Sequence, residues 1–64
     1  MKPNTEQLAA LRRFAERNGV NWKQSLSMHW MRGTDDSLVD GHLYRQLRNV
    51  FGPVWLDTFE FPNL

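Results

Sequence analysis

The hydrophobic and polar positions of this chain follow a helical period over most of its length. Residues 6–18 consist largely of Leu, Ala, Arg, Glu and Gln, which are good helix formers. Asn4 and Thr5 precede this run and Gly19 follows it, so we expect a first helix over residues 6–18. Its apolar positions are three and four residues apart and form one stripe: Leu8, Leu11, Phe14 and Ala15.

A second helix is expected over residues 22–32. Asn21 can cap its start, and Gly33 stands just past its end, where glycine is common. One face carries aromatic and apolar groups: Trp22, Leu26, His29 and Trp30.

Two methionines lie on the opposite side of this second helix. At about 100° per residue, Met28 and Met31 fall near Lys23, Gln24 and Ser27. A helix with apolar groups on two faces is either central to the fold or offers one face to a partner. The methionines can therefore contact a partner, or the C-terminal segment can fold back and cover them. The sequence leaves both alternatives open.

An acidic loop is expected over residues 34–41, with aspartates that are solvated and can cap the next helix. That helix is expected over residues 41–51 and ends at Gly52 and Pro53. Its apolar stripe consists of Leu43, Leu47, Val50 and Phe51. Tyr44 is expected at the edge of this stripe, and Arg45 and Arg48 are expected to face outward.

The C-terminal end predicts one further helical turn and an extended tail. Proline suits the first helical position, so Pro53 can open a turn over residues 54–58. Residues 59–62 alternate apolar and polar, which favours an extended segment laid over the core. The prediction is an all-α fold, a single compact domain over residues 1–64 with three helices. Its expected core is Leu8, Leu11, Phe14, Trp22, Leu26, Trp30, Leu43, Leu47, Val50, Phe51 and Trp55.

Composition narrows the class of protein. With 64 residues the chain has room for one domain, and eight aromatic residues compensate for its small core. It has no cysteine, so disulfides and thiolate metal sites are excluded. No apolar run approaches the roughly 20 residues of a membrane span, and no signal-peptide core is present. We therefore expect a cytoplasmic protein without a membrane partner.

Charge is distributed unevenly along the chain. Residues 1–33 hold six basic and two acidic side chains, whereas residues 34–64 hold two basic and five acidic ones.

A short turn around Gly19 between two helices resembles a DNA-reading helix-turn-helix unit. Two features fit this unit poorly: Trp22 is bulky for a base-reading position, and a net charge of +1 is low for a protein that neutralises phosphates. The candidate nucleic-acid contacts are Arg12, Arg13, Arg17, Lys23 and Arg32.

No motif predicts catalysis, a metal or a cofactor. Ser25, Ser27 and His29 lack an accompanying nucleophile elbow, and we expect His29 to hydrogen-bond the backbone at the edge of the core. His42 stands near Asp40, but two histidines thirteen positions apart match no metal-ligand spacing. The sequence therefore predicts no enzyme activity, no cofactor and no small-molecule substrate.

Two segments carry a resemblance to a known group of proteins. They are Asn21-Trp22-Lys23-Gln24-Ser25-Leu26 with His29-Trp30-Met31-Arg32-Gly33, and Leu47-Arg48-Asn49-Val50-Phe51-Gly52-Pro53-Val54-Trp55-Leu56. This pattern resembles short proteins of proteobacteria and their plasmids or integrated elements, a group with no known activity. The resemblance implies a bacterial cytoplasmic source and a mobile-element setting, and it supplies no catalytic residues.

These patterns predict a protein that binds without catalysing a reaction. The leading hypothesis is a small interaction module that modulates a larger protein, or self-associates, through the face of the second helix. The alternative is a small nucleic-acid-binding regulator that uses the basic residues named above. The candidate protein-binding residues are Lys23, Gln24, Ser27, Met28 and Met31.

Overall fold

The computed structural model describes residues 2–62, and their fold is all-α. Three helices make up most of it: α1 (Thr5–Asn18), α2 (Trp22–Arg32) and α3 (Gly41–Phe51). A single turn, α4 (Trp55–Thr58), follows, and 3₁₀ turns occupy Gly19–Asn21 and Asp35–Ser37. The helices predicted over residues 6–18, 22–32 and 41–51 are confirmed, and the turn predicted over 54–58 begins one residue later. No helix within residues 2–62 combines the length and apolar character needed to cross a membrane.

Local side-chain and backbone chemistry sets the start of α1 and the end of α2. The Asn4 side chain accepts a hydrogen bond of 2.7 Å from the Gln7 amide, and the Gln7 side chain accepts one of 2.9 Å from the Asn4 amide. This reciprocal pair satisfies two donors that a helix start leaves free. At the end of α2, Gly33 adopts a left-handed conformation with φ 70°, and its amide binds the carbonyls of His29 and Trp30.

Two predicted caps are wrong. Asn21 precedes α2 but its side chain makes no capping hydrogen bond, because a 3₁₀ turn leads directly into the helix. Asp40 precedes α3 with a left-handed φ of 66°, and its carboxylate binds Arg13 on α1 rather than the amides of α3. A contact of Asp40 with α1 has therefore replaced a local cap.

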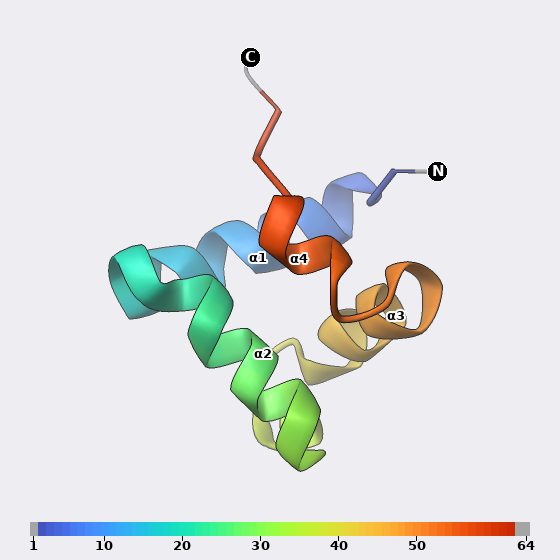
Figure 1. Cartoon of the computed structure of the whole chain (residues 1–64). Helices are drawn as coiled ribbons and strands as arrows, with labels where there is room; N and C mark the ends of the chain where they lie inside the picture. Colours follow the sequence, from blue (N-terminus) through green and yellow to red (C-terminus); the bar gives the residue numbers. More distant parts are fainter. Residues whose placement is uncertain (1, 63–64) are drawn as a thin grey trace.

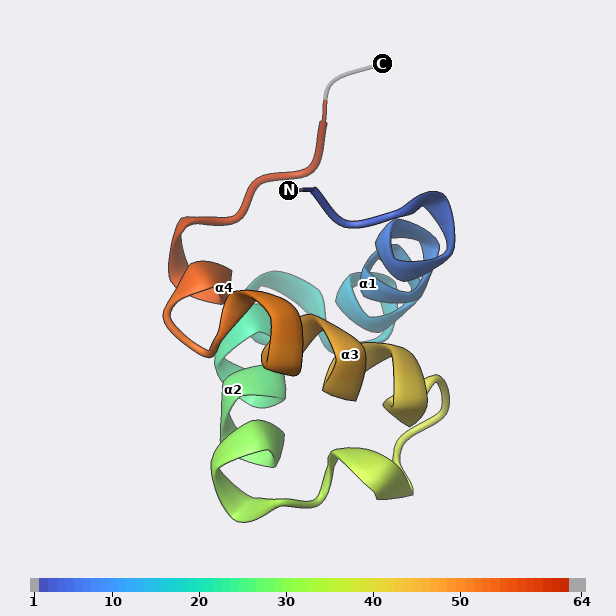
Figure 2. The ribbon, with the colours of Figure 1, turned by 90° about the vertical axis from the view of Figure 1, so that its right-hand side faces the viewer.

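The three long helices surround one core, and α4 packs against α2 (Figure 1). Figure 2 shows the same arrangement from the side, with the chain after α4 rising past α1. The Cα radius of gyration is 10.7 Å, close to the roughly 11 Å expected for a compact domain of this length.

Six of the residues predicted for the core are buried: Leu11, Phe14, Leu26, Trp30, Leu43 and Leu47. Four more are half-buried and pack against them: Leu8, Trp22, Phe51 and Trp55. Val50 was predicted wrongly, because its side chain is 53% exposed. The sequence pattern did not single out Ala10, Leu56 or Phe59, which are also buried.

Tyr44 lies inside the core and not at its edge. Its side chain is fully buried, and its ring packs edge-on against Phe14 with centroids 5.4 Å apart. The hydroxyl donates a hydrogen bond of 2.9 Å to the carbonyl of Ala10, which explains how a polar group is accommodated there. Burial raises the pKa of the Tyr44 phenol above its ordinary value.

The segment before α3 is more ordered than the predicted acidic loop. Asp35 is 1% exposed, so it is not a solvated turn residue. Arg45 on α3 lies beside it, with its Nε 3.6 Å from a carboxylate oxygen of Asp35, and also pairs with Asp36. These ion pairs hold the segment against α3, and Asp36 remains exposed as expected.

Candidate interaction surfaces

The face of α2 opposite the core presents both methionines to solvent. Met31 is 80% exposed and Met28 is 42% exposed. Gln24 is exposed on the same face, and Ser27 is half-buried. The chain after α4 packs on Trp22 and does not cover the methionines, so the alternative in which the tail buries them is wrong.

A shallow hollow adjoins Met28. It has a volume of about 230 Å³ and is lined by Ser25, Met28, His29 and Arg32. His29 shares a hydrogen bond of 2.8 Å between its Nδ1 and the Oγ1 of Thr34, so the predicted backbone partner is wrong. The hollow thus offers a hydroxyl, an imidazole and a guanidinium beside one methionine.

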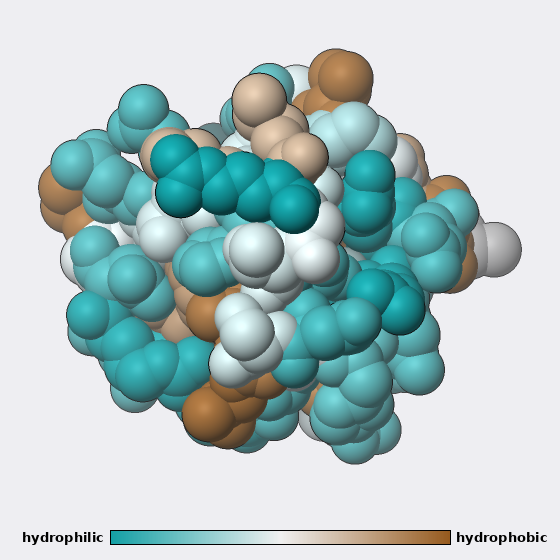
Figure 3. Space-filling view, turned by 90° about the horizontal axis from the view of Figure 1, so that it is seen from below, coloured by the Kyte–Doolittle hydropathy of each residue, from teal (hydrophilic) through white to brown (hydrophobic). Residues whose placement is uncertain are grey.

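The apolar groups on one face of the molecule are dispersed. Seen from below, the molecule shows small hydrophobic areas separated by hydrophilic ones (Figure 3). Val20 and Val54 are also exposed, at 96% and 74%, but they lie outside α2. A partner that binds α2 would therefore rely on a few apolar anchors in a polar surround.

Arg13, one of the candidate nucleic-acid residues, is paired within the molecule. Its Nε donates a hydrogen bond of 2.9 Å to the Asp40 carboxylate. That hydrogen bond lowers the pKa of Asp40 and raises the pKa of Arg13. The pairing reduces the positive charge that Arg13 can offer to a phosphate.

Arg12 and Lys23 contact the C-terminal segment. The guanidinium carbon of Arg12 lies 4.5 Å from the centre of the Phe61 ring. Lys23 is half-buried, and its Nζ donates to the carbonyl oxygen of Phe59. The other two candidates have different surroundings, since Arg17 lies 6.0 Å from the Phe14 ring centre and Arg32 lines the hollow on α2.

An aromatic cluster joins α2, α4 and the C-terminal segment. The Trp22 ring stacks on Phe61 with centroids 5.6 Å apart, and Trp55 lies 5.0 Å from Phe59 and 4.6 Å from Phe51. The alternating pattern of residues 59–62 predicted a segment laid over the core, but it did not indicate the contacts with Arg12 and Lys23. In the sequence, the alternating aromatic residues of the tail were the one feature that pointed to contacts of this segment.

The described residues contain no arrangement that indicates metal binding. Among residues 2–62, no group of three His, Asp or Glu side chains is placed to hold a metal ion. Ser25 and His29 line the same hollow, but no hydrogen bond joins them within this part of the chain. His42 is exposed at the start of α3.

The chain was compared with known proteins at three levels. No family model, no curated protein and no solved structure matches it.

Proposed function

We propose that this chain is a small non-enzymatic interaction module that binds a larger protein through the exposed face of α2. The observation that carries the proposal is the exposure of Met28 and Met31, at 42% and 80%, on a helix whose other face is buried in the core. Apolar side chains that face water on a well-packed helix are available to a partner. Methionine is flexible and polarizable, which suits an adaptable contact.

The hollow beside Met28 defines the chemistry of the expected partner. Arg32 and His29 offer positive or hydrogen-bonding groups there, and Ser25 adds a hydroxyl. An apolar side chain over the methionines, followed by an acidic one in the hollow, would match this surface. Gln24 and Ser27 lie on the same face and complete its polar rim.

The setting we propose is the cytoplasm of a bacterium, in association with a mobile genetic element. This part of the proposal depends on the resemblance carried by the Trp-Lys and Phe-Gly-Pro-x-Trp-Leu segments. Self-association through the same face of α2 is the alternative form of binding.

Nucleic-acid binding is the competing proposal, and it has less support. Arg13 is paired with Asp40, and Arg12 and Lys23 contact the C-terminal segment. Affinity for nucleic acid depends mainly on cations that neutralise phosphates, so these internal contacts weaken the case.

The test is an affinity purification of the tagged full chain from its native cells, with and without nuclease. Met28→Glu with Met31→Glu is compared with Val20→Glu, which adds a like charge at another exposed apolar residue. We expect the double variant to fold and to lower affinity for the co-purified partner at least about tenfold, because the charge would be buried at the contact. Val20→Glu should retain the partner.

Two results would contradict this proposal. Equal retention of the partner by both variants would exclude the α2 face as the binding surface. Retention of nucleic acid by the wild type, with a steep loss as salt rises and on charge reversal at Arg13 and Arg17, would favour the competing proposal.

A further inference from the structure

The ring of Phe61 occupies a slot formed by Arg12, Trp22 and Phe59. Trp22 stacks on Phe61 with an interplanar angle of 29°, and Phe59 meets it edge-on with centroids 5.0 Å apart. Arg12 lies 4.5 Å from the ring centre, within the range of a cation–π contact. We refer to Arg12, Trp22 and Phe59 as the aromatic slot.

Phe61 is held in the slot by contacts of its side chain and not by main-chain hydrogen bonds of the described residues. Phe59 is buried and belongs to the core, whereas Phe61 is only half-buried. Within the described chain, the Phe59 amide makes the last main-chain hydrogen bond, to Leu56, and none involves residues 60–62. Release of Phe61 from the slot therefore breaks no main-chain hydrogen bond among the described residues.

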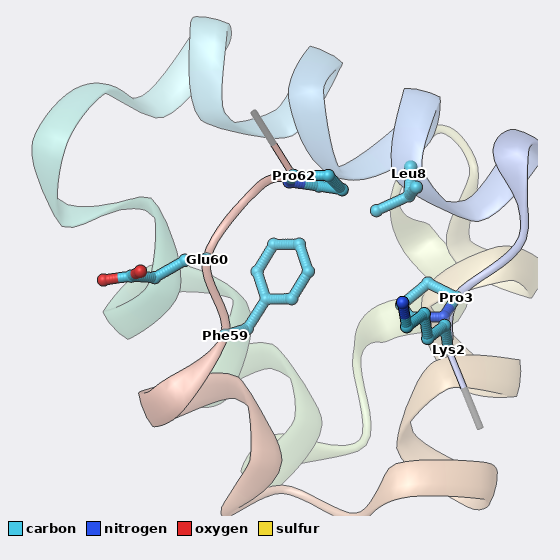
Figure 4. Close-up of a pocket in the computed structure, with 6 residues that line it drawn as sticks. All are labelled: Lys2, Pro3, Leu8, Phe59, Glu60 and Pro62. Carbon is cyan, nitrogen blue, oxygen red and sulfur yellow. The ribbon is translucent and has the colours of Figure 1, made fainter. Parts of the chain in front are cut away.

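An apolar groove runs beside the slot, between α1 and the C-terminal segment. One hollow of about 330 Å³ is lined mainly by Pro3, Leu8, Phe59 and Pro62. Figure 4 shows these side chains around it, with the Glu60 side chain pointing away. A second hollow of about 270 Å³ shares Leu8 and Pro62 and extends to Arg12 in the slot.

We propose that the slot, together with Leu8 and Arg12 on the α1 side of this groove, binds an extended, acidic segment of a partner protein. An aromatic side chain of the partner replaces Phe61, and Pro62 leaves the groove with Phe61. The ring of Phe61 shows which chemistry the slot accepts: an aromatic group stacked on Trp22 and beside the guanidinium of Arg12. Lys2 lines the first hollow and Arg12 the second, so the two basic residues favour acidic side chains on the partner.

A peptide suits the site better than a nucleic acid does. A nucleobase can stack on Trp22, but a bound strand also requires cations for its phosphates, and the neighbouring Arg13 is paired with Asp40. The slot and groove include neither Met28 nor Met31. The two proposals can therefore fail independently.

Phe61 acts as an intramolecular competitor in this arrangement. A short tether gives a local concentration in the millimolar range, so the tail masks the slot against weak ligands. Removal of the ring by Phe61→Ala should strengthen binding of an added peptide by about tenfold or more.

The experiment uses a fluorescent peptide with the sequence of residues 57–62, Asp-Thr-Phe-Glu-Phe-Pro, and measures its binding by fluorescence anisotropy. The proteins are the full-length wild type, Phe61→Ala, and Phe61→Ala combined with Arg12→Gln or Arg48→Gln. Arg48 is an exposed arginine on α3 that contributes to neither hollow, so it controls for charge alone. We expect tight binding only where Phe61 is removed and Arg12 is kept. The same peptide with both phenylalanines changed to alanine should not bind.

Three results would overturn the proposal: no tighter binding by Phe61→Ala than by the wild type, equal losses from the Arg12 and Arg48 variants, or preferred binding of a single-stranded oligonucleotide. If Phe61→Ala does not fold, the wild type is titrated with millimolar peptide and the NMR signals of the Trp22 indole and Arg12 Nε are followed. Shifts confined to these two groups support the slot, and unchanged signals exclude it.

Discussion

Tyr44 shows how one polar atom can be kept inside a small core. Its hydroxyl donates to the Ala10 carbonyl, which joins α3 to α1 at a position with no access to water. The expectation of an edge position followed from its place beside the apolar stripe. Helical spacing alone does not show that a neighbouring helix supplies an acceptor for the hydroxyl.

Replacement of Tyr44 by phenylalanine should lower the free energy of unfolding by about 1 kcal/mol at neutral pH, since a buried hydrogen bond is lost. Because the pKa of Tyr44 is raised in the folded state, the wild type is stabilised by this group below the ordinary tyrosine pKa of about 10. That contribution is lost as pH rises through the raised pKa, so the difference between the two proteins should shrink above pH ~10. Urea unfolding at neutral and alkaline pH measures this. A constant difference would contradict it.

Asp40 combines a left-handed backbone with a charged contact to α1. An asparagine side chain at this position tolerates the same φ of 66° but cannot form the ion pair with Arg13. We expect Asp40→Asn to be less stable than the wild type at neutral pH. The pKa of Asp40 is lowered in the folded state, so its contribution is present above the ordinary value of about 4 and is lost as pH falls through the lowered pKa.

The difference between Asp40→Asn and the wild type should therefore disappear in acid. Thermal unfolding across the acidic range measures it, with Asp57→Asn, at an exposed carboxylate on α4, as the matched control. A difference that persists at the lowest pH would assign the effect to the backbone.

Among the elements, the 3₁₀ turn Asp35–Ser37 and α3 are packed so closely that Gly41 has no room for a side chain. A Cβ atom added at Gly41 would lie 2.2 Å from the carbonyl oxygen of Asp35. Main-chain atoms cannot move aside as a flexible side chain can. The glycine at this position therefore permits the contact that buries Asp35.

Gly41→Ala should lower the free energy of unfolding by about 1–3 kcal/mol, as overpacking of a filled site does. Alanine is the better helix former by up to about 1 kcal/mol, but the clash with the main chain exceeds that gain. Denaturant unfolding measures the loss, and His42→Ala at the exposed next position should be nearly neutral. Equal stability of Gly41→Ala and the wild type would show that the turn can move away from α3.

In the molecule as a whole, α4 and the segment after it close the core that the three long helices leave open on one side. Leu56 is fully buried and Phe59 is 8% exposed, so this end of the chain contributes to the core directly. The chain after Phe59 adds the half-buried Phe61. Phe59 thus helps to close the core, whereas Phe61, two residues later, occupies the aromatic slot and is only half-buried.

Phe59→Ala should lower the free energy of unfolding by about 3–5 kcal/mol, which is enough to unfold much of a domain of this size. Phe61→Ala should cost about 1 kcal/mol, because its ring is only half-buried. Denaturant unfolding of the two variants compares these losses. Similar losses would indicate that Phe61 is a core residue and would weaken its proposed role as a displaceable ring.

Short-range patterns in the sequence were enough to place the three helices, their ends at Gly19, Gly33 and Gly52, and the separation of Met28 and Met31 from the buried face of α2. These features depend on residues within a few positions of one another, through side-chain spacing and glycine conformation. The same patterns predicted which basic residues are exposed on α1, since Arg12 and Arg13 lie off its apolar stripe.

The contacts of those exposed and polar groups depend instead on how the helices pack. Asp40 binds Arg13 across 27 positions, Tyr44 binds Ala10 across 34 and Lys23 binds Phe59 across 36. Helical periodicity carries no information about partners so far apart in the chain. For the same reason the sequence pattern placed Val50 in the core and Asp35 in solvent, whereas packing of α3 against its neighbours reversed both positions.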